Sequence, residues 1–171
     1  LMYYDGEGVP QDYKEASKWL RRAAEHGTAG AQFLLGWMHY KGQGVLPDYK
    51  QASKWIRIAA NQGLAIAQAN LGFMYLKGEG VPQNYKEAAK WFKLAAEQGV
   101  SSAQFKLGMM YEHGRGVPQD PVSAYMWYSL GASQGHKTAM EHRDLVGKKM
   151  TPAQIQTAQQ LAKEWLTKHD G

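Results

Sequence analysis

Residues 64–99 read LAIAQANLGFMYLKGEGVPQNYKEAAKWFKLAAEQG, and this 36-residue pattern recurs before and after the stretch without a change in spacing. Tryptophans recur at this interval, at Trp19, Trp55, Trp91 and Trp127. Paired glycines recur with them, at Gly6/Gly8, Gly42/Gly44, Gly78/Gly80 and Gly114/Gly116. A strict period of this length predicts an array of supersecondary units, which stack because one unit cannot bury its apolar face alone.

Each unit predicts two helices joined by short loops. In residues 64–77 the apolar and small side chains share one helical face, namely Ala67, Leu71, Met74 and Tyr75. Gly78 is expected to end this helix because glycine adopts a left-handed turn without steric cost. Asn84 is expected to cap the second helix, with Glu87 completing a capping box. Such short links predict antiparallel packing of the two helices.

The repeated sequence pattern resembles the Sel1-like repeat, a relative of the tetratricopeptide repeat. The matching positions are Ala67, Leu71, Gly72, Met74, Tyr75, Gly78, Gly80, Val81, Pro82, Asn84, Tyr85, Ala88, Trp91, Ala95, Ala96 and Gly99. The resemblance covers most of the chain. It implies an α/α superhelix, or solenoid, of antiparallel helix pairs, and the predicted fold class is therefore all-α.

The period also divides the chain. We expect a truncated first repeat at residues 1–27, repeats at 28–63, 64–99 and 100–135, a degenerate helix plus a C-terminal capping helix at 136–168, and a fraying tail at 169–171. Leu1 aligns with Trp37, so the chain is expected to begin inside a helix, followed by a loop at residues 6–11. Under this expectation, the lack of a signal peptide says nothing about export.

Composition excludes several classes of function. The formal net charge is +5, but the basic residues are spread along outward helix faces and paired with acidic ones, which does not predict a nucleic-acid-binding patch. The 171 residues include no cysteine, so a disulfide, a thiolate nucleophile and a Cys-ligated zinc are excluded. No apolar run of about 18 residues is present to span a membrane.

The recurring residues are interpreted as scaffold. The four repeated tryptophans are expected in the core, and the glycine pairs are explained by loop geometry, because a phosphate-binding loop would follow a strand. His39 stands where other units have tyrosine and is interpreted as a packing residue. His136 and His142 are six residues apart, which on one helix would direct them away from each other.

Side chains that differ between repeats are the candidates for function, because the scaffold does not require them. If the first helix of each unit lines a concave wall, as the resemblance implies, these side chains form an aromatic groove edged by lysines. The predicted peptide-binding residues are Phe33, Trp37, Lys41, Asn70, Phe73, Lys77, Phe105, Lys106 and Met109. Such a groove suits an extended peptide or a partner helix with acidic character. The alternative is that the large apolar members thicken the core between repeats.

The predicted function is a non-catalytic scaffold or adaptor that binds a peptide or partner protein, without cofactor or metal. Some cysteine-rich Sel1 proteins are linked to β-lactam hydrolysis, but this chain has neither those cysteines nor an S-x-x-K motif, so a hydrolase stays a minor alternative. Self-association through the N-terminal end is another. The resemblance suggests a bacterial assembly or envelope signalling complex, with the compartment, periplasmic or cytoplasmic, left open.

Overall fold

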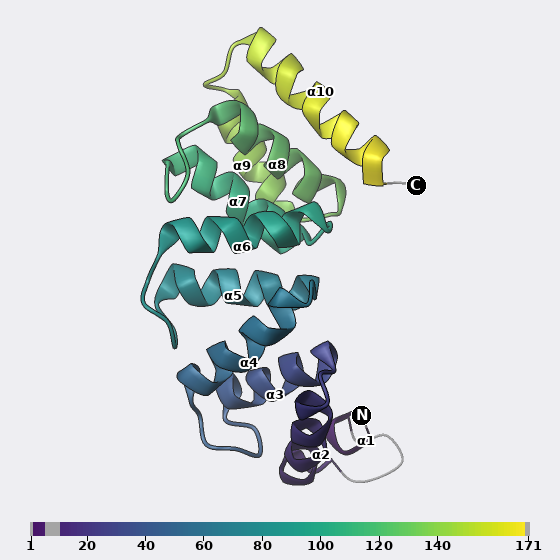
Figure 1. The fold of residues 1–171 in the computed structure, drawn as a ribbon. Helices are drawn as coiled ribbons and strands as arrows, with labels where there is room; N and C mark the ends of the chain where they lie inside the picture. Colours follow the sequence, from purple (N-terminus) through teal and green to yellow (C-terminus); the bar gives the residue numbers. More distant parts are fainter. Residues whose placement is uncertain (1, 6–10, 170–171) are drawn as a thin grey trace. The chain divides into compact units, whose positions relative to one another are not determined.

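A computed structural model describes residues 2–5 and 11–169, and within these ranges it contains helices, turns and loops but no strand. The chain divides into two compact units, Leu1–Asn84 and Tyr85–Gly171. The helices of the first unit are α1 (Met2–Asp5), α2 (Tyr13–Glu25), α3 (Ala29–Lys41), α4 (Tyr49–Asn61) and α5 (Ala65–Lys77). Those of the second are α6 (Tyr85–Glu97), α7 (Ser101–His113), α8 (Pro121–Ser133), α9 (Lys137–Gly147) and α10 (Pro152–His169). Figure 1 shows both sets as ribbons.

Within each unit, consecutive helices pack on one another. In the first unit α3 contacts both α2 and α4, and α4 also contacts α5. In the second, α7 packs between α6 and α8, while α9 and α10 both lie against α8, as Figure 1 shows. The predicted helix pairs are therefore present. The loop at residues 6–10 and the last two residues of the tail lie outside the described residues.

Side-chain caps fix where the helices begin. Oδ1 of Asp48 accepts hydrogen bonds from the backbone N–H groups of Lys50 and Gln51 at 2.8 and 3.0 Å, which satisfies two donors that have no partner inside the helix. Thr151 and Gln154 form a capping box at the start of α10, with hydrogen bonds of 2.9 and 3.3 Å in opposite directions. Both helices thus begin at a side-chain cap.

The two glycines have different roles in the pairs that the structure describes, Gly42/Gly44, Gly78/Gly80 and Gly114/Gly116. The first ends a helix in the left-handed conformation, as Gly78 does with a φ of +76°. The second also has a positive φ, and a Cβ placed on Gly80 would collide with the carbonyl of Tyr49 at the start of α4. The second glycine therefore lets the loop lie directly on the preceding repeat, so substitution there is doubly unfavourable.

The core consists of small alanines and a few large apolar side chains. Leu20, Leu35 and Met38 are fully buried in the first unit, and Phe92, Leu107 and Tyr128 are nearly or fully buried in the second. Buried glutamines complete it: Nε2 of Gln32 donates to the carbonyl of Ala24, and the same bond recurs at Gln68 and Gln104. Each glutamine satisfies a carbonyl at the end of the preceding helix.

The prediction that all four repeated tryptophans lie in the core was wrong for one of them. Trp91 and Trp127 are 7% and 6% exposed, and Trp55 is partly buried. Trp19, however, is 50% exposed, with the guanidinium of Arg22 lying 5.1 Å from its ring centre. Trp19 is not part of the core cluster through which α2 packs against α3.

Candidate functional site

The first cleft is a cavity of about 280 Å³ in the first unit, formed where α3 and α5 approach each other. It is lined by Trp37, Tyr40, Lys41, Ile56, Asn70, Phe73, Met74, Lys77 and Glu79. Five of the nine side chains that the sequence predicted for peptide binding are in this set, namely Trp37, Lys41, Asn70, Phe73 and Lys77. Residues 36 places apart in the sequence thus meet in one cavity.

A stack of aromatic rings forms one wall of the first cleft. Trp37 lies parallel to Tyr40, with ring centres 5.4 Å apart and planes inclined by 11°. Phe33 stacks on the other side of Trp37 at 6.4 Å and 23°. Positions 33, 37 and 40 follow the i, i+4, i+7 pattern of one helical face, so α3 itself aligns the rings. All three rings are partly exposed and offer flat apolar area to a ligand.

Two lysines line the first cleft, Lys41 next to the aromatic wall and Lys77 on α5. The ammonium of Lys41 is 4.9 Å from the centre of the Trp37 ring, which is the geometry of a cation–π contact. The Lys77 ammonium is 3.6 Å from Glu79 Oε1, and its side chain is 55% exposed. Both cations therefore remain accessible to an anionic group.

Tyr40 and Glu79 connect the two sides of the first cleft. The Tyr40 hydroxyl donates a hydrogen bond of 2.8 Å to Glu79 Oε2. Burial, together with this bond and the negative charge of Glu79, raises the pKa of Tyr40 to about 12. The hydroxyl is therefore protonated at neutral pH and holds the carboxylate in place. Sequence reasoning missed both residues, which are not among the nine predicted peptide-binding residues.

One predicted residue of the second unit, Phe105, lies in the core. Phe105 is 8% exposed and belongs to a core cluster with Tyr128 and Val146. Lys106 extends over the Phe105 ring at 5.2 Å and lies 3.9 Å from the sulfur of Met109. Phe105 therefore fits the alternative interpretation, in which the apolar side chains thicken the core between repeats. We remove Phe105 from the candidate site.

Two histidines explain this burial and correct a second expectation. The ring of His136 stacks on Phe105 with centres 4.8 Å apart, and the ring of His142 meets it edge-on at 5.4 Å. His136 precedes α9 and caps it, accepting a hydrogen bond from the N–H of Ala139. Since His136 lies outside the helix, the six-residue spacing does not separate the two rings as expected.

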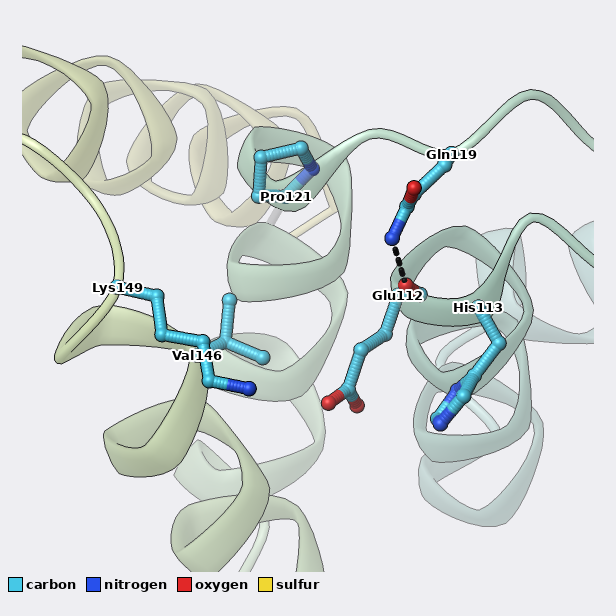
Figure 2. Close-up of a pocket in the computed structure, with 6 residues that line it drawn as sticks. All are labelled: Glu112, His113, Gln119, Pro121, Val146 and Lys149. Atoms are coloured by element: carbon cyan, nitrogen blue, oxygen red, sulfur yellow. Dashed lines mark hydrogen bonds between the residues drawn. The ribbon is translucent and has the colours of Figure 1, made fainter.

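The second cleft is a cavity of about 530 Å³ in the second unit. Figure 2 shows the residues that line it, Glu112, His113, Gln119, Pro121, Val146 and Lys149. The carboxylate of Glu112 points into the space between His113 and the Val146–Lys149 side (Figure 2). The Gln119 side chain donates to the backbone carbonyl of Glu112 at 2.8 Å and so fixes the loop to the end of α7.

A buried tyrosine holds the Glu112 carboxylate. The Tyr128 hydroxyl donates a hydrogen bond of 2.6 Å to Glu112 Oε2, and Nδ1 of His142 lies 3.4 Å from the same oxygen. Burial raises the pKa of Tyr128 strongly, and the hydrogen bond and charge of Glu112 raise it further. The hydroxyl is therefore a permanent donor at neutral pH.

The two clefts occupy the same place in the repeat. Lining residues of the second stand two periods, or 72 residues, after those of the first: 112 − 40 = 72. The corresponding pairs are Tyr40/Glu112, Lys41/His113, Met74/Val146 and Lys77/Lys149. The same backbone framework thus presents two different sets of side chains.

Over residues 2–5 and 11–169, no group of three or more His, Cys, Asp or Glu side chains is placed to hold a metal ion. In the same ranges, every helix is too short or too polar to cross a membrane.

The comparison with protein families decides the identity of the repeat. The family model for the Sel1 repeat matches residues 1–28, 29–64, 65–100 and 101–136. The chain belongs to the Sel1 repeat family. Proteins built from Sel1 repeats are generally protein-interaction modules and typically non-catalytic scaffolds. The all-α solenoid class predicted from the sequence is confirmed.

Solved structures of similar proteins agree with this family. A protective antigen of uropathogenic Escherichia coli that displays an SLR fold is 36% identical, with a TM-score of 0.87; the match covers 98% of this chain and 36% of that one. A Sel1 repeat protein from Oxalobacter formigenes is 39% identical, with a TM-score of 0.79, and the match covers 83% of this chain and 58% of that one. The chain thus spans well under two thirds of either relative.

A more distant structure shares the fold alone. Cysteine-rich protein B of Helicobacter pylori is 18% identical, with a TM-score of 0.60, and the match covers 80% of this chain and 98% of that one. The search of the curated proteins gave no match.

Proposed function

We propose that this Sel1 repeat protein is a non-catalytic adaptor that binds an extended peptide segment of a partner protein in the first cleft. The segment places an apolar or aromatic side chain against Trp37 and an acidic side chain between Lys41 and Lys77. The observation that carries the proposal is the partly exposed Trp37 ring, which lines the first cleft together with the Lys41 ammonium.

The stacked aromatic rings and the lysines of the first cleft support a peptide with apolar and acidic side chains. Aromatic rings and long cations that lie together in a concavity are the residue types enriched at the centres of protein interfaces. The ring stack is preformed on α3, so a peptide does not have to order it on binding. Glu79 is engaged by Tyr40 and Lys77, which leaves Lys41 as the cation of the lining set without a carboxylate partner among the described residues.

The occupant is proposed to be a peptide because of the shape of the site. A cavity of about 280 Å³ is at the lower end of the range for small-molecule pockets, and it has room for one side chain rather than a whole folded surface. Asn70 lies on the same side as Phe73 and offers an amide for hydrogen bonds to the backbone of an extended segment, while its own Nδ2 donates to the Ile66 carbonyl at 2.8 Å.

The test uses a displayed library of random ten-residue peptides selected on the folded protein. We expect selected peptides to combine an aromatic or large aliphatic residue with acidic residues. The double variant Trp37→Ala/Phe73→Ala should lose at least about tenfold in affinity for them, since hot-spot aromatics contribute 2 kcal/mol or more. The matched control is Trp19→Ala, which removes a half-exposed tryptophan outside the cleft and should leave the affinity unchanged.

A second candidate function is self-association, which the exposed Trp19 ring favours. An aromatic side chain with half its surface in water is a typical anchor of a protein interface. Light scattering over a range of protein concentrations tests this candidate: a dimer that Trp19→Ala dissociates supports self-association, whereas a monomer at all concentrations contradicts it.

A further inference from the structure

Glu112 and Tyr128 at the second cleft stand where the other repeats have different, uncharged residues. The positions equivalent to Tyr128 are Leu20, Ile56 and Phe92, and all of them are buried. The positions equivalent to Glu112 are Tyr4, Tyr40 and Leu76. The fold therefore requires neither the Tyr128 hydroxyl nor the Glu112 carboxylate, yet this repeat contains both, joined by a hydrogen bond of 2.6 Å.

That bond orients the Glu112 carboxylate toward the cavity. Oε2 of Glu112 accepts from Tyr128 and lies near Nδ1 of His142, whereas Oε1 has no hydrogen-bond or ion-pair partner in the described part of the chain. The Glu112 side chain is only 23% exposed, so its remaining oxygen faces the cleft and little else. A partly buried charge with an unused oxygen is poorly solvated and gains from a cationic partner.

The opposite side of the same cavity carries a cation. Figure 2 shows the Lys149 side chain reaching toward Glu112 from the segment after α9. The two side chains form no ion pair with each other, and the Lys149 ammonium has no hydrogen-bond partner within the described residues. The apolar side chains of Val146 and Pro121 also line the cavity, with Val146 beside Lys149 (Figure 2). The cleft thus holds two separated, unlike charges on an apolar base.

We propose that the second cleft is a binding site for a peptide segment with neighbouring basic and acidic residues, its lysine or arginine at Glu112 and its aspartate or glutamate at Lys149. Charge complementarity favours this occupant. A purely anionic segment would be repelled by Glu112, and a purely cationic segment would be repelled by Lys149. Relative to the first cleft, Glu112 replaces Tyr40 and His113 replaces Lys41, and both changes make the site less attractive to anions. Binding at the second cleft is proposed independently of peptide binding at the first cleft.

The test is an NMR titration of the ¹⁵N-labelled full chain with five blocked tripeptides. The probe with both charges is N-acetyl-lysyl-alanyl-aspartyl amide, used also in the reverse order. The others replace lysine by glutamine, aspartate by asparagine, or both. We expect the doubly charged probe to bind about tenfold more tightly than either singly charged probe, because each charged hydrogen bond adds to binding. Shifts should concentrate at Glu112, His113 and Lys149, which separates this site from the first cleft.

Two variants locate the cation site. Glu112→Gln keeps the size of the side chain and should abolish the preference for lysine over glutamine in the probe. Tyr128→Phe keeps the core filled, as Phe92 does at the equivalent position, and should reduce that preference because the carboxylate is no longer held. The control is Glu141→Gln on the exposed face of α9, which should change nothing.

Three outcomes would overturn the proposal. The first is equal affinity for the acidic probe and the doubly charged one, which would make the cleft a simple anion site. The second is absence of binding by every probe at millimolar concentration. The third is an unchanged lysine preference in a folded Glu112→Gln protein. The comparison among probes uses the unmodified protein, so the test stands even if a variant fails to fold.

Discussion

The hydroxyl of Tyr40 donates a 2.8 Å hydrogen bond to Oε2 of Glu79, and this bond joins α3 to the loop that follows α5. It therefore connects two successive repeats at the rim of the first cleft. The second cleft has a related bond, from Tyr128 to Glu112, with the tyrosine in the core and the carboxylate at the rim. In both clefts a tyrosine determines where a carboxylate lies, and so which charges a ligand meets.

The Tyr40–Glu79 bond predicts a stability change at high pH. The pKa of Tyr40 is raised from 10 in the unfolded chain to about 12 in the folded protein, so its stabilising contribution is complete below pH 10 and is lost as the pH rises through 12. Urea unfolding from pH 8 to pH 12 should show a loss of stability above pH 10 that Tyr40→Phe reduces. The same loss in both proteins would show that other groups cause it.

His39 predicts a stability change at low pH. Its side chain is 8% exposed, and within residues 2–5 and 11–169 neither ring nitrogen has a partner at good hydrogen-bond geometry, although the Leu46 backbone lies close enough to act on the ring. Burial lowers the pKa of His39; the positive charge of Arg21 also lowers it, while the Leu46 backbone and Asp48 act in the opposite direction. Because the folded pKa is depressed, the stability is present above the unfolded value of 6.5 and is lost as the pH falls through the folded pKa.

His39→Tyr tests this effect, because tyrosine occupies the equivalent positions 75 and 111. We expect the thermal midpoint of the unmodified protein to fall more between pH 7.5 and pH 5 than that of the variant. His26 is exposed, and the control variant His26→Gln should behave as the unmodified protein. Parallel pH profiles for the unmodified protein and His39→Tyr would contradict the assignment.

The second glycine of each pair predicts a steric effect beyond backbone strain. Gly80→Ala brings a Cβ into the carbonyl of Tyr49, whereas Gly63→Ala has a similar positive φ of +88° and no atom within 4 Å of the new Cβ. Left-handed alanine costs about 1 kcal/mol at either site. Urea unfolding should show that Gly80→Ala costs at least about 1 kcal/mol more than Gly63→Ala. Equal losses would mean that the loop can move away from α4.

The repeated tryptophans predict unequal costs of truncation. Trp91 is 7% exposed, so Trp91→Ala leaves a large cavity and should destabilise the protein by about 3–5 kcal/mol. Trp19 is half exposed, and Trp19→Ala should cost about 1 kcal/mol or less. Denaturant unfolding monitored by circular dichroism gives both values. If the two costs were similar, burial of the repeated position would not explain its recurrence.

The period and the caps were enough to predict the helices, because glycine turns, aspartate caps and apolar faces act through neighbouring residues. The first cleft could be predicted in part: Trp37, Phe73 and Lys77 stand out as departures from the scaffold. Phe105 could not be placed correctly, because its burial depends on His136 and His142, which come from a degenerate repeat. Glu112 could have been found by comparing it with Tyr40 and Leu76 at the same repeat position.

The unequal exposure of Trp19 and Trp91 could not be predicted from the sequence either. Trp19 and Trp91 have nearly identical sequence surroundings, KEASKW and KEAAKW, but one is half exposed and the other buried. The difference comes from which helices lie against each ring, and a local pattern carries no information about that.

Peptide binding in the first cleft is tested most directly by reversing its charge. An acidic, aromatic peptide selected on the unmodified protein is measured by fluorescence anisotropy against Lys41→Glu/Lys77→Glu, with Lys54→Glu/Lys90→Glu as a control of equal net charge on exposed positions outside the cleft. We predict that the cleft variant loses at least about tenfold in affinity and gains affinity for the same peptide with lysines in place of its acidic residues. Equal affinities of the cleft and control variants for the acidic peptide would contradict the account.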